Sequence, residues 1–169
     1  MDVFKEQNVV RLLTKNDNIR KLLIVFVAVM AAMAFFLLGL MIPTFLMFAI
    51  VFAGLSLYGG YYFVTATYIE YEYILTNGEL DFDKIIAQRS RKRLCTVKLS
   101  QATALDVLND NSDTDGADTY VVATANDPEQ QDYFLRVKHK TLGDTVVYFT
   151  PSEEMLGLIK QALPRNMRT

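Results

Sequence analysis

Charged side chains are missing from one long part of this 169-residue chain: residues 22–69 contain no Asp, Glu, Lys, Arg or His. A helix that crosses the roughly 30 Å hydrocarbon core of a bilayer needs about 20 apolar residues. The stretch is therefore long enough for two crossings and a turn. Pro43 interrupts it near the middle, where the missing backbone donor and the ring end a helix. We expect a transmembrane helical hairpin over residues 22–67, with helices at about 22–40 and 45–63.

Cysteine and histidine are also scarce. Cys95 is the single cysteine, so the chain cannot form an internal disulfide. His139 is the single histidine and stands between two lysines, so neither a zinc site nor a Cys/His nucleophile can be assembled from the spacing. There is no glycine-rich phosphate loop and no nucleophile elbow. We therefore predict no metal, no cofactor, no catalytic residue and no enzymatic activity.

The formal net charge of −2 is small, and no basic run with interleaved aromatic residues is present. The composition therefore predicts no nucleic-acid partner. The partner that the sequence does predict is the lipid bilayer. The positions of the Lys and Arg residues indicate how the chain is oriented in the membrane. They flank the outer ends of the two expected helices, whereas the turn between the helices has none. Because such residues stay on the cytoplasmic side, we expect both termini in the cytoplasm.

Residues 1–21 form a mixed N-terminal segment that we expect on the cytoplasmic side. Most of its apolar residues fall on about half of a helix circumference, with Phe4 as an outlier. This spacing favours a short helix lying along the membrane surface. A partly ordered tail is the alternative.

After residue 68 the apolar residues alternate with a period of two, as expected for a strand in a cytoplasmic β-domain over residues 68–169. Asn77-Gly78 is a strong signal for a two-residue hairpin turn. This turn predicts a register in which Leu75 faces Leu80 and Tyr73 faces Phe82. Acidic side chains then gather on the outer face of the hairpin. The basic residues of a third strand would lie near that face.

Further strands are predicted at residues 102–108, 119–123, 133–138 and 145–149, with an exposed acidic loop at 109–118. The chain ends in an amphipathic helix over residues 151–163. Thr150 is the expected N-cap, Pro151 takes the first helical position, and Glu153 completes a capping box.

About seven strands followed by one C-terminal helix form the pattern of a pleckstrin-homology-like (PH-like) barrel. The segment Tyr71-Glu72-Tyr73-Ile74-Leu75-Thr76-Asn77-Gly78, followed by Ile85, a basic run and Leu94, resembles the opening of bacterial membrane-anchored PH-like domains. Those domains typically follow a pair of transmembrane helices, as here. The resemblance implies a membrane hairpin joined to a mainly-β barrel with a capping helix, in a multi-pass protein of the bacterial inner membrane. It implies no catalytic or ligand-binding residue.

Four basic residues that follow the expected β-hairpin are the candidate site: Arg89, Arg91, Lys92 and Arg93. Beside an anionic membrane each would contribute about 1 kcal/mol of attraction. The alternative is that they pair with the acidic face of their own domain, which carries Glu70, Glu72, Asp81 and Asp83. The predicted function is a membrane protein whose PH-like domain binds a protein partner or lipid headgroups. A structural or accessory subunit of a larger membrane complex is the alternative.

Overall fold

The chain divides into two compact units in a computed structural model that describes residues 3–109, 112 and 114–167. One unit, called the β-unit here, combines the segments Met1–Leu12 and Ile69–Thr169. The other, the helical unit, is the segment Leu13–Tyr68 between them. The helical unit is therefore an insertion within the chain of the β-unit.

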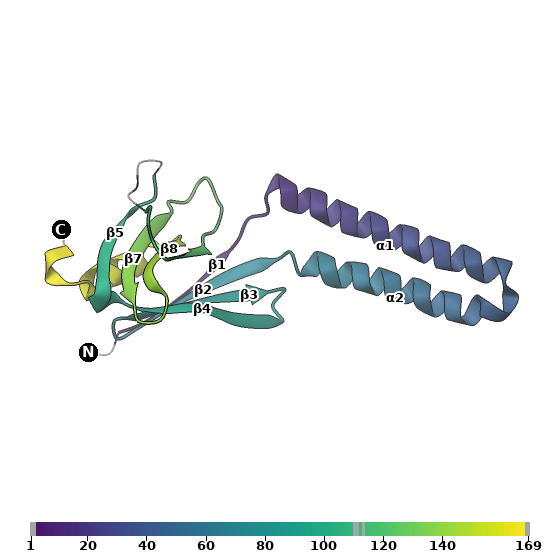
Figure 1. The fold of residues 1–169 in the computed structure, drawn as a ribbon, viewed down its shortest axis with the longest axis horizontal. Helices are drawn as coiled ribbons and strands as arrows, with labels where there is room; N and C mark the ends of the chain where they lie inside the picture. Colours follow the sequence, from purple (N-terminus) through teal and green to yellow (C-terminus); the bar gives the residue numbers. More distant parts are fainter. Residues whose placement is uncertain (1–2, 110–111, 113, 168–169) are drawn as a thin grey trace. The chain divides into compact units, whose positions relative to one another are not determined.

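The helical unit contains two long helices, α1 (Lys15–Met41) and α2 (Leu46–Thr65), which lie side by side (Figure 1). Thr14 starts α1 as its N-cap, and a reciprocal capping box with Asp17 satisfies the first backbone donors. The helix therefore begins seven residues before the expected position 22. A short 3-10 turn, η1 (Pro43–Phe45), connects the helices at the predicted proline.

Small residues hold α1 and α2 together. A Cβ atom added to Gly39 would lie 2.6 Å from the Cβ of Ala49, and one added to Gly60 would lie 2.5 Å from the Cβ of Ala28. Both distances are shorter than van der Waals contact, so only glycine allows the two backbones to approach this closely. Small residues at such contacts are typical of helices that associate in membranes.

The first sheet of the β-unit is antiparallel and has the strand order β1-β2-β3-β4. Its strands are β1 (Phe4–Val10), β2 (Ile69–Thr76), β3 (Glu79–Ile86) and β4 (Ser90–Lys98). The turn between β2 and β3 places Asn77 and Gly78 at φ values of 47° and 85°, as a type I′ turn requires. Leu75 pairs with Leu80 and Tyr73 pairs with Phe82, which confirms the predicted register.

Strand β1 replaces the surface helix expected in residues 1–21. Strand β1 lies beside β2 (Figure 1). Its seven residues pair antiparallel with β2, and Val9 is buried opposite Tyr71. The expectation of a helix was wrong because the apolar spacing within residues 1–21 contains no information about a partner strand far along the chain. The backbone groups of β1 are satisfied by a strand that follows in the chain only after both helices.

The second sheet has the order β5-β7-β8-β6, with strands β5 (Ala102–Val107), β6 (Thr119–Ala123), β7 (Tyr133–His139) and β8 (Gly143–Phe149). Strand β6 runs parallel to β8, and the other pairs are antiparallel. The expected seven-stranded barrel is thus corrected: in the described part of the chain, eight strands form two separate four-stranded sheets. Residues 110, 111 and 113 of the predicted acidic loop lie outside the described residues.

The two sheets and the C-terminal helix α3 (Glu153–Ala162) enclose one core. At its centre the rings of Tyr73, Phe82 and Phe149 contact one another edge to face, at centroid distances of 5.3, 5.8 and 5.5 Å. Met155 and Ile159 of α3 are fully buried beside them. These rings and side chains supply much of the apolar burial that stabilises the unit.

The N-cap of α3 is Ser152, whose hydroxyl accepts a hydrogen bond from the backbone N–H of Met155 at 3.2 Å. The expected cap, Thr150, has other partners. Its hydroxyl accepts from the backbone N–H of Ala125 and donates to Asp132. The helix starts at Glu153 and not at 151 because the Thr150 hydroxyl is already engaged in the core.

Candidate functional site

Both chain connections to the helical unit leave the β-unit from one end of its first sheet. Val10, the last residue of β1, pairs with Glu70 at the start of β2, and the backbone N–H of Arg11 donates to the carbonyl of Ile69 at 3.0 Å. We call this end of the first sheet the junction end. The β3–β4 turn lies there too, because Ile86 pairs with Ile69. The predicted basic residues are therefore within a few residue pairs of the connections.

The outer face of the sheet, which faces away from the core, carries two buried carboxylates at the junction end. Glu72 and Asp83 pair directly across β2 and β3 and are only 5% and 2% exposed. Like charges in this position destabilise a strand pair unless cations compensate them. Two arginines of β4 provide that compensation.

Arg91 and Arg93 both bind Asp83, each through its Nε at 2.7 Å. Arg91 also contacts Glu72, and Arg93 reaches Asp81 at 2.8 Å. The hydrogen bond to Asp83 and the neighbouring carboxylates raise the pKa of Arg93 above its ordinary value. For these two residues the structure thus shows the intradomain pairing that the sequence left as an alternative to membrane contact.

Lys92 points to the opposite, inner face of the sheet, the face that carries Tyr71 and the core. It pairs directly with Lys84 of β3, and Lys84 pairs with Tyr71 of β2. Tyr71 is buried, which raises the pKa of its hydroxyl, and the nearby Arg11 opposes this rise. The predicted cluster is thus divided between two faces of the sheet, with two arginines on one face and Lys92 on the other.

Arg89 closes the turn between β3 and β4 by donating its backbone N–H to the carbonyl of Ile86 at 3.0 Å. The two central residues of this turn, Ala87 and Gln88, have φ values of 53° and 55°. A positive φ is unfavourable for residues that have a Cβ atom. The Gln88 side chain offsets part of this strain by donating a hydrogen bond to Glu70 at 3.0 Å.

Sequence reasoning missed Lys84 as part of this site, although a signal was present. The register predicted from Asn77-Gly78 already places Lys84 opposite Tyr71. The step from Lys84 to Lys92 could not be predicted, because an irregularity in the register between Phe82 and Asp83 shifts the pairing of β4 by one residue.

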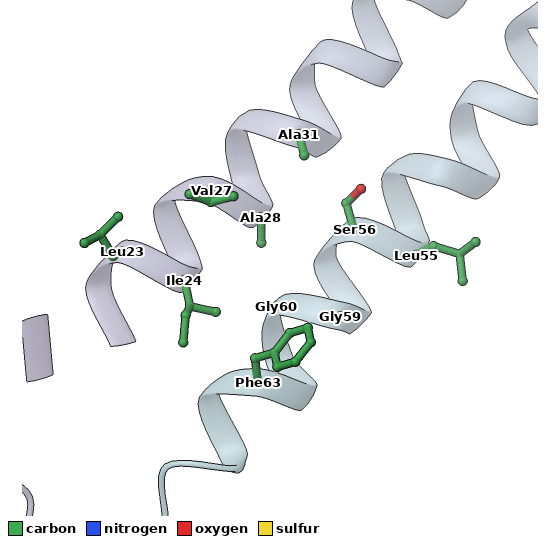
Figure 2. Close-up of a pocket in the computed structure, with 10 residues that line it drawn as sticks. All are labelled: Leu23, Ile24, Val27, Ala28, Ala31, Leu55, Ser56, Gly59, Gly60 and Phe63. Atoms are coloured by element: carbon green, nitrogen blue, oxygen red, sulfur yellow. The ribbon is translucent and has the colours of Figure 1, made fainter. Parts of the chain in front are cut away.

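A second candidate surface is a groove between the two helices, with a volume of about 470 Å³. Figure 2 shows Ala28 and Ala31 of α1 directed toward α2 and Ser56 of α2 directed toward α1. Gly59 also lines the groove, yet a Cβ added there would meet no atom within 4 Å. The groove is therefore wider than contact between the two helices requires.

The single histidine is held by hydrogen bonds, and the single cysteine is buried. His139 Nδ1 accepts hydrogen bonds from the backbone N–H groups of Thr141 and Leu142, and its Nε2 lies 3.1 Å from the carbonyl oxygen of Thr96. Burial, with Asp81 nearby, raises the pKa of the Cys95 thiol to about 12, so it is a poor nucleophile. Among the described residues no three His, Cys, Asp or Glu side chains are placed to hold a metal ion.

The helices and sheets together define a class of protein. Both α1 and the segment Pro43–Thr65 are long and apolar enough to cross a membrane, and they are joined to a mainly-β unit of two sheets and a C-terminal helix, as in PH-like domains. The chain belongs to the family described as "Bacterial PH-like domain (DUF6106)", whose family model matches residues 1–169. Searches of curated proteins and of solved structures gave no match.

Proposed function

We propose that this protein is an integral protein of the bacterial inner membrane whose PH-like domain binds lipid headgroups at the cytoplasmic surface. The observation that carries the proposal is the pairing of β1 with β2. These strands precede and follow the helical unit, yet they are neighbours in one sheet. A membrane-spanning helical pair must then have both ends on the same side of the bilayer.

The side follows from charge. Lys15, Arg20 and Lys21 lie in the first two turns of α1, and exposed basic residues surround the β3–β4 turn at the junction end. The turn around Pro43 has no charged residue. Lys and Arg near membrane-spanning helices remain on the cytoplasmic side. The Lys21 ammonium also lies 3.8 Å from the centre of the Tyr68 ring, and such a cation–aromatic contact suits the interface.

The topology can be tested in whole cells with the substitution Ser100→Cys, at an exposed position of the β-unit. A membrane-impermeant maleimide is expected to label this cysteine only after the inner face is opened. Cys95→Ala in the same chain removes the native thiol as a source of background. Labelling of intact cells from outside would contradict the proposed orientation.

Headgroup binding can be tested with the full chain in nanodiscs of phosphatidylcholine, with and without one-third phosphatidylglycerol. Hydrogen exchange of the β-unit amides is measured in both lipids. Binding predicts slower exchange on part of the β-unit surface in the anionic discs only, and the protection should fade as salt screens the charges. Equal exchange in both lipids would refute headgroup binding and favour a protein partner as the ligand of the domain.

The groove between α1 and α2 favours a second function, that of an accessory subunit in a larger membrane complex. Its small side chains would let the helix of another membrane protein approach closely. Under this hypothesis Gly59→Leu, which the open space around Gly59 can accept, should abolish a complex that survives in mild detergent. The matched control is Gly54→Leu, because Gly54 is also open but is not part of the groove. Migration of the wild-type protein as a lone monomer would contradict this second function.

A further inference from the structure

Lys84 and Lys92 form an uncompensated pair of positive charges on the inner face of the first sheet. They are directly opposite each other on β3 and β4. Like charges in directly opposite positions destabilise a sheet. Within the part of the chain that the structure describes, neither ammonium group has a carboxylate oxygen within 4.0 Å. The neighbouring residue pair is different, because there Arg93 is opposite Asp83 and binds it.

The acidic residues of the same strands do not relieve this repulsion, because they are on the other face. Glu72 and Asp83 alternate with Tyr71 and Lys84 along their strands, so they project outward and bind the arginines. The inner face beside the lysine pair instead has an aromatic and apolar floor. Tyr71 lies next to Lys84, and Ile69 and Ile86 form the next residue pair of the same face toward the junction end.

The pair is also close to the point where the chain leaves the helical unit. Tyr71 is three residues after Tyr68, and a strand advances about 3.3 Å per residue. At most about 10 Å of strand therefore separates the backbone of Tyr68 from the Tyr71–Lys84–Lys92 row. That is comparable with the Debye length of about 8 Å at physiological salt, the range over which an anionic membrane surface attracts cations.

We propose that Lys84 and Lys92 together bind the phosphate of an anionic lipid headgroup. The inference rests on the proposed function and names the residues and the ligand chemistry. Two ammonium groups can donate hydrogen bonds to different oxygens of one phosphate, and the bound anion removes the repulsion between them. Arg91 and Arg93, which the sequence also offered, are occupied by their own carboxylates.

The direct test measures the acylation rate of each lysine by mass spectrometry in the full chain. The protein is placed in nanodiscs of phosphatidylcholine alone or with one-third phosphatidylglycerol. Lys84 and Lys92 are expected to react about fivefold more slowly in the anionic discs, the effect of one charge at an anionic surface. The rates of Lys138 and Lys160, on β7 and α3, should not change.

Three outcomes separate the inference from the proposed function. Protection of other β-unit lysines, but not of Lys84 and Lys92, would overturn the inference and leave headgroup binding intact. No protection of any β-unit lysine, together with unchanged amide exchange, would overturn both. Inorganic phosphate in phosphatidylcholine discs tests the remaining source: equal protection there would show a site for free phosphate and overturn the lipid assignment.

A variant distinguishes binding from a merely structural effect. Lys92→Gln removes the repulsion, so it should raise the thermal midpoint of the β-unit in phosphatidylcholine discs. In anionic discs the wild-type chain gains stability from the bound headgroup and the variant should gain much less. The control Lys98→Gln alters an exposed lysine at the other end of β4, where it pairs with Glu79. An equal shift for Lys92→Gln in both lipids would refute the proposal.

Discussion

Substitution of Arg91 by alanine should destabilise the β-unit by an amount that depends on pH. Arg91 is the cation in contact with Glu72, whose side chain is only 7% exposed. Among the described residues no other cation lies within 4.0 Å of that carboxylate. Asp83 is affected less by the substitution, because Arg93 still binds it at 2.7 Å. The main consequence is therefore a buried carboxylate without a partner.

The size of the loss has an upper limit set by proton binding. Removing one partner of a buried ion pair typically costs about 3–5 kcal/mol. The Arg91 side chain is half exposed, so water reaches part of the site and we expect about 2 kcal/mol at pH 7. Glu72 can instead take up a proton, which for a glutamate with an ordinary pKa near 4.3 costs about 3.7 kcal/mol at pH 7 and about 1 kcal/mol at pH 5. The loss should therefore fall to about 1 kcal/mol or less at pH 5, at most about half of its value at pH 7.

The assay is pulse proteolysis in urea on the full chain, since the sequence has no tryptophan to report unfolding. Lys92→Ala is the comparison, because it removes a neighbouring β4 cation that has no ion pair within the described residues. Whatever its effect on stability, that effect should be the same at pH 5 and pH 7, since the lysine is charged at both. The double variant Glu72→Gln, Arg91→Ala should be more stable at pH 7 than Arg91→Ala alone. An equal loss at pH 5 and pH 7 would refute the reasoning and assign the effect to lost packing of the arginine side chain.

Three further predictions concern the β-unit. Replacing residues 13–68 by a short Asn-Gly turn should give a soluble folded domain, because the end of β1 lies beside the start of β2. A fragment of residues 68–169 should be less stable than this domain by at least about 2 kcal/mol in urea, since it lacks β1 and exposes the surface that Val9 covers. Burial raises the pKa of Asp132 above its ordinary 3.8, with the Thr150 hydrogen bond opposing the rise. The folded state therefore favours the protonated carboxyl of Asp132. This preference stabilises the folded state at low pH, and the stabilisation should decline as the pH rises from 3.8 through the raised pKa. Asp132→Asn should remove the decline, as measured by urea titrations followed by circular dichroism. Cys95, 5% exposed and with its pKa raised to about 12, should resist iodoacetamide at pH 8 in the folded chain and react in urea; rapid reaction without denaturant would contradict the burial.

Local signals were sufficient for the part of the fold that is built from neighbours in sequence. Asn77-Gly78 fixed the register of β2 and β3, and this register correctly placed the acidic residues of both strands on one outer face. The sequence also predicted basic residues of a third strand near that face, and Arg91 and Arg93 do bind Asp83 there. The helices were also predicted, because charge is absent from a stretch of the length needed for two crossings.

Features that depend on distant parts of the chain were missed. The partner of β1 lies beyond both helices, so no pattern within residues 1–21 indicates a strand. Thr150 has the sequence context of an N-cap, but Asp132 and Ala125 compete for its hydroxyl in the folded state. The parallel pairing of β6 with β8 likewise depends on how the chain crosses the sheet after β6. Lys84 was missed because the position of Lys92 depends on the register shift beside Phe82.

The placement of β1 before the helices and β2 after them has a consequence for biogenesis in the proposed topology. A ribosome releases β1 first, and this strand has no partner until both helices have been made and β2 has followed. Insertion of only one helix would leave β1 and β2 on opposite sides of the bilayer. Such a chain would have a β-unit that lacks its edge strand and exposes apolar surface, the state that cellular proteases remove. The folding of the domain would thus report whether the anchor had been inserted correctly.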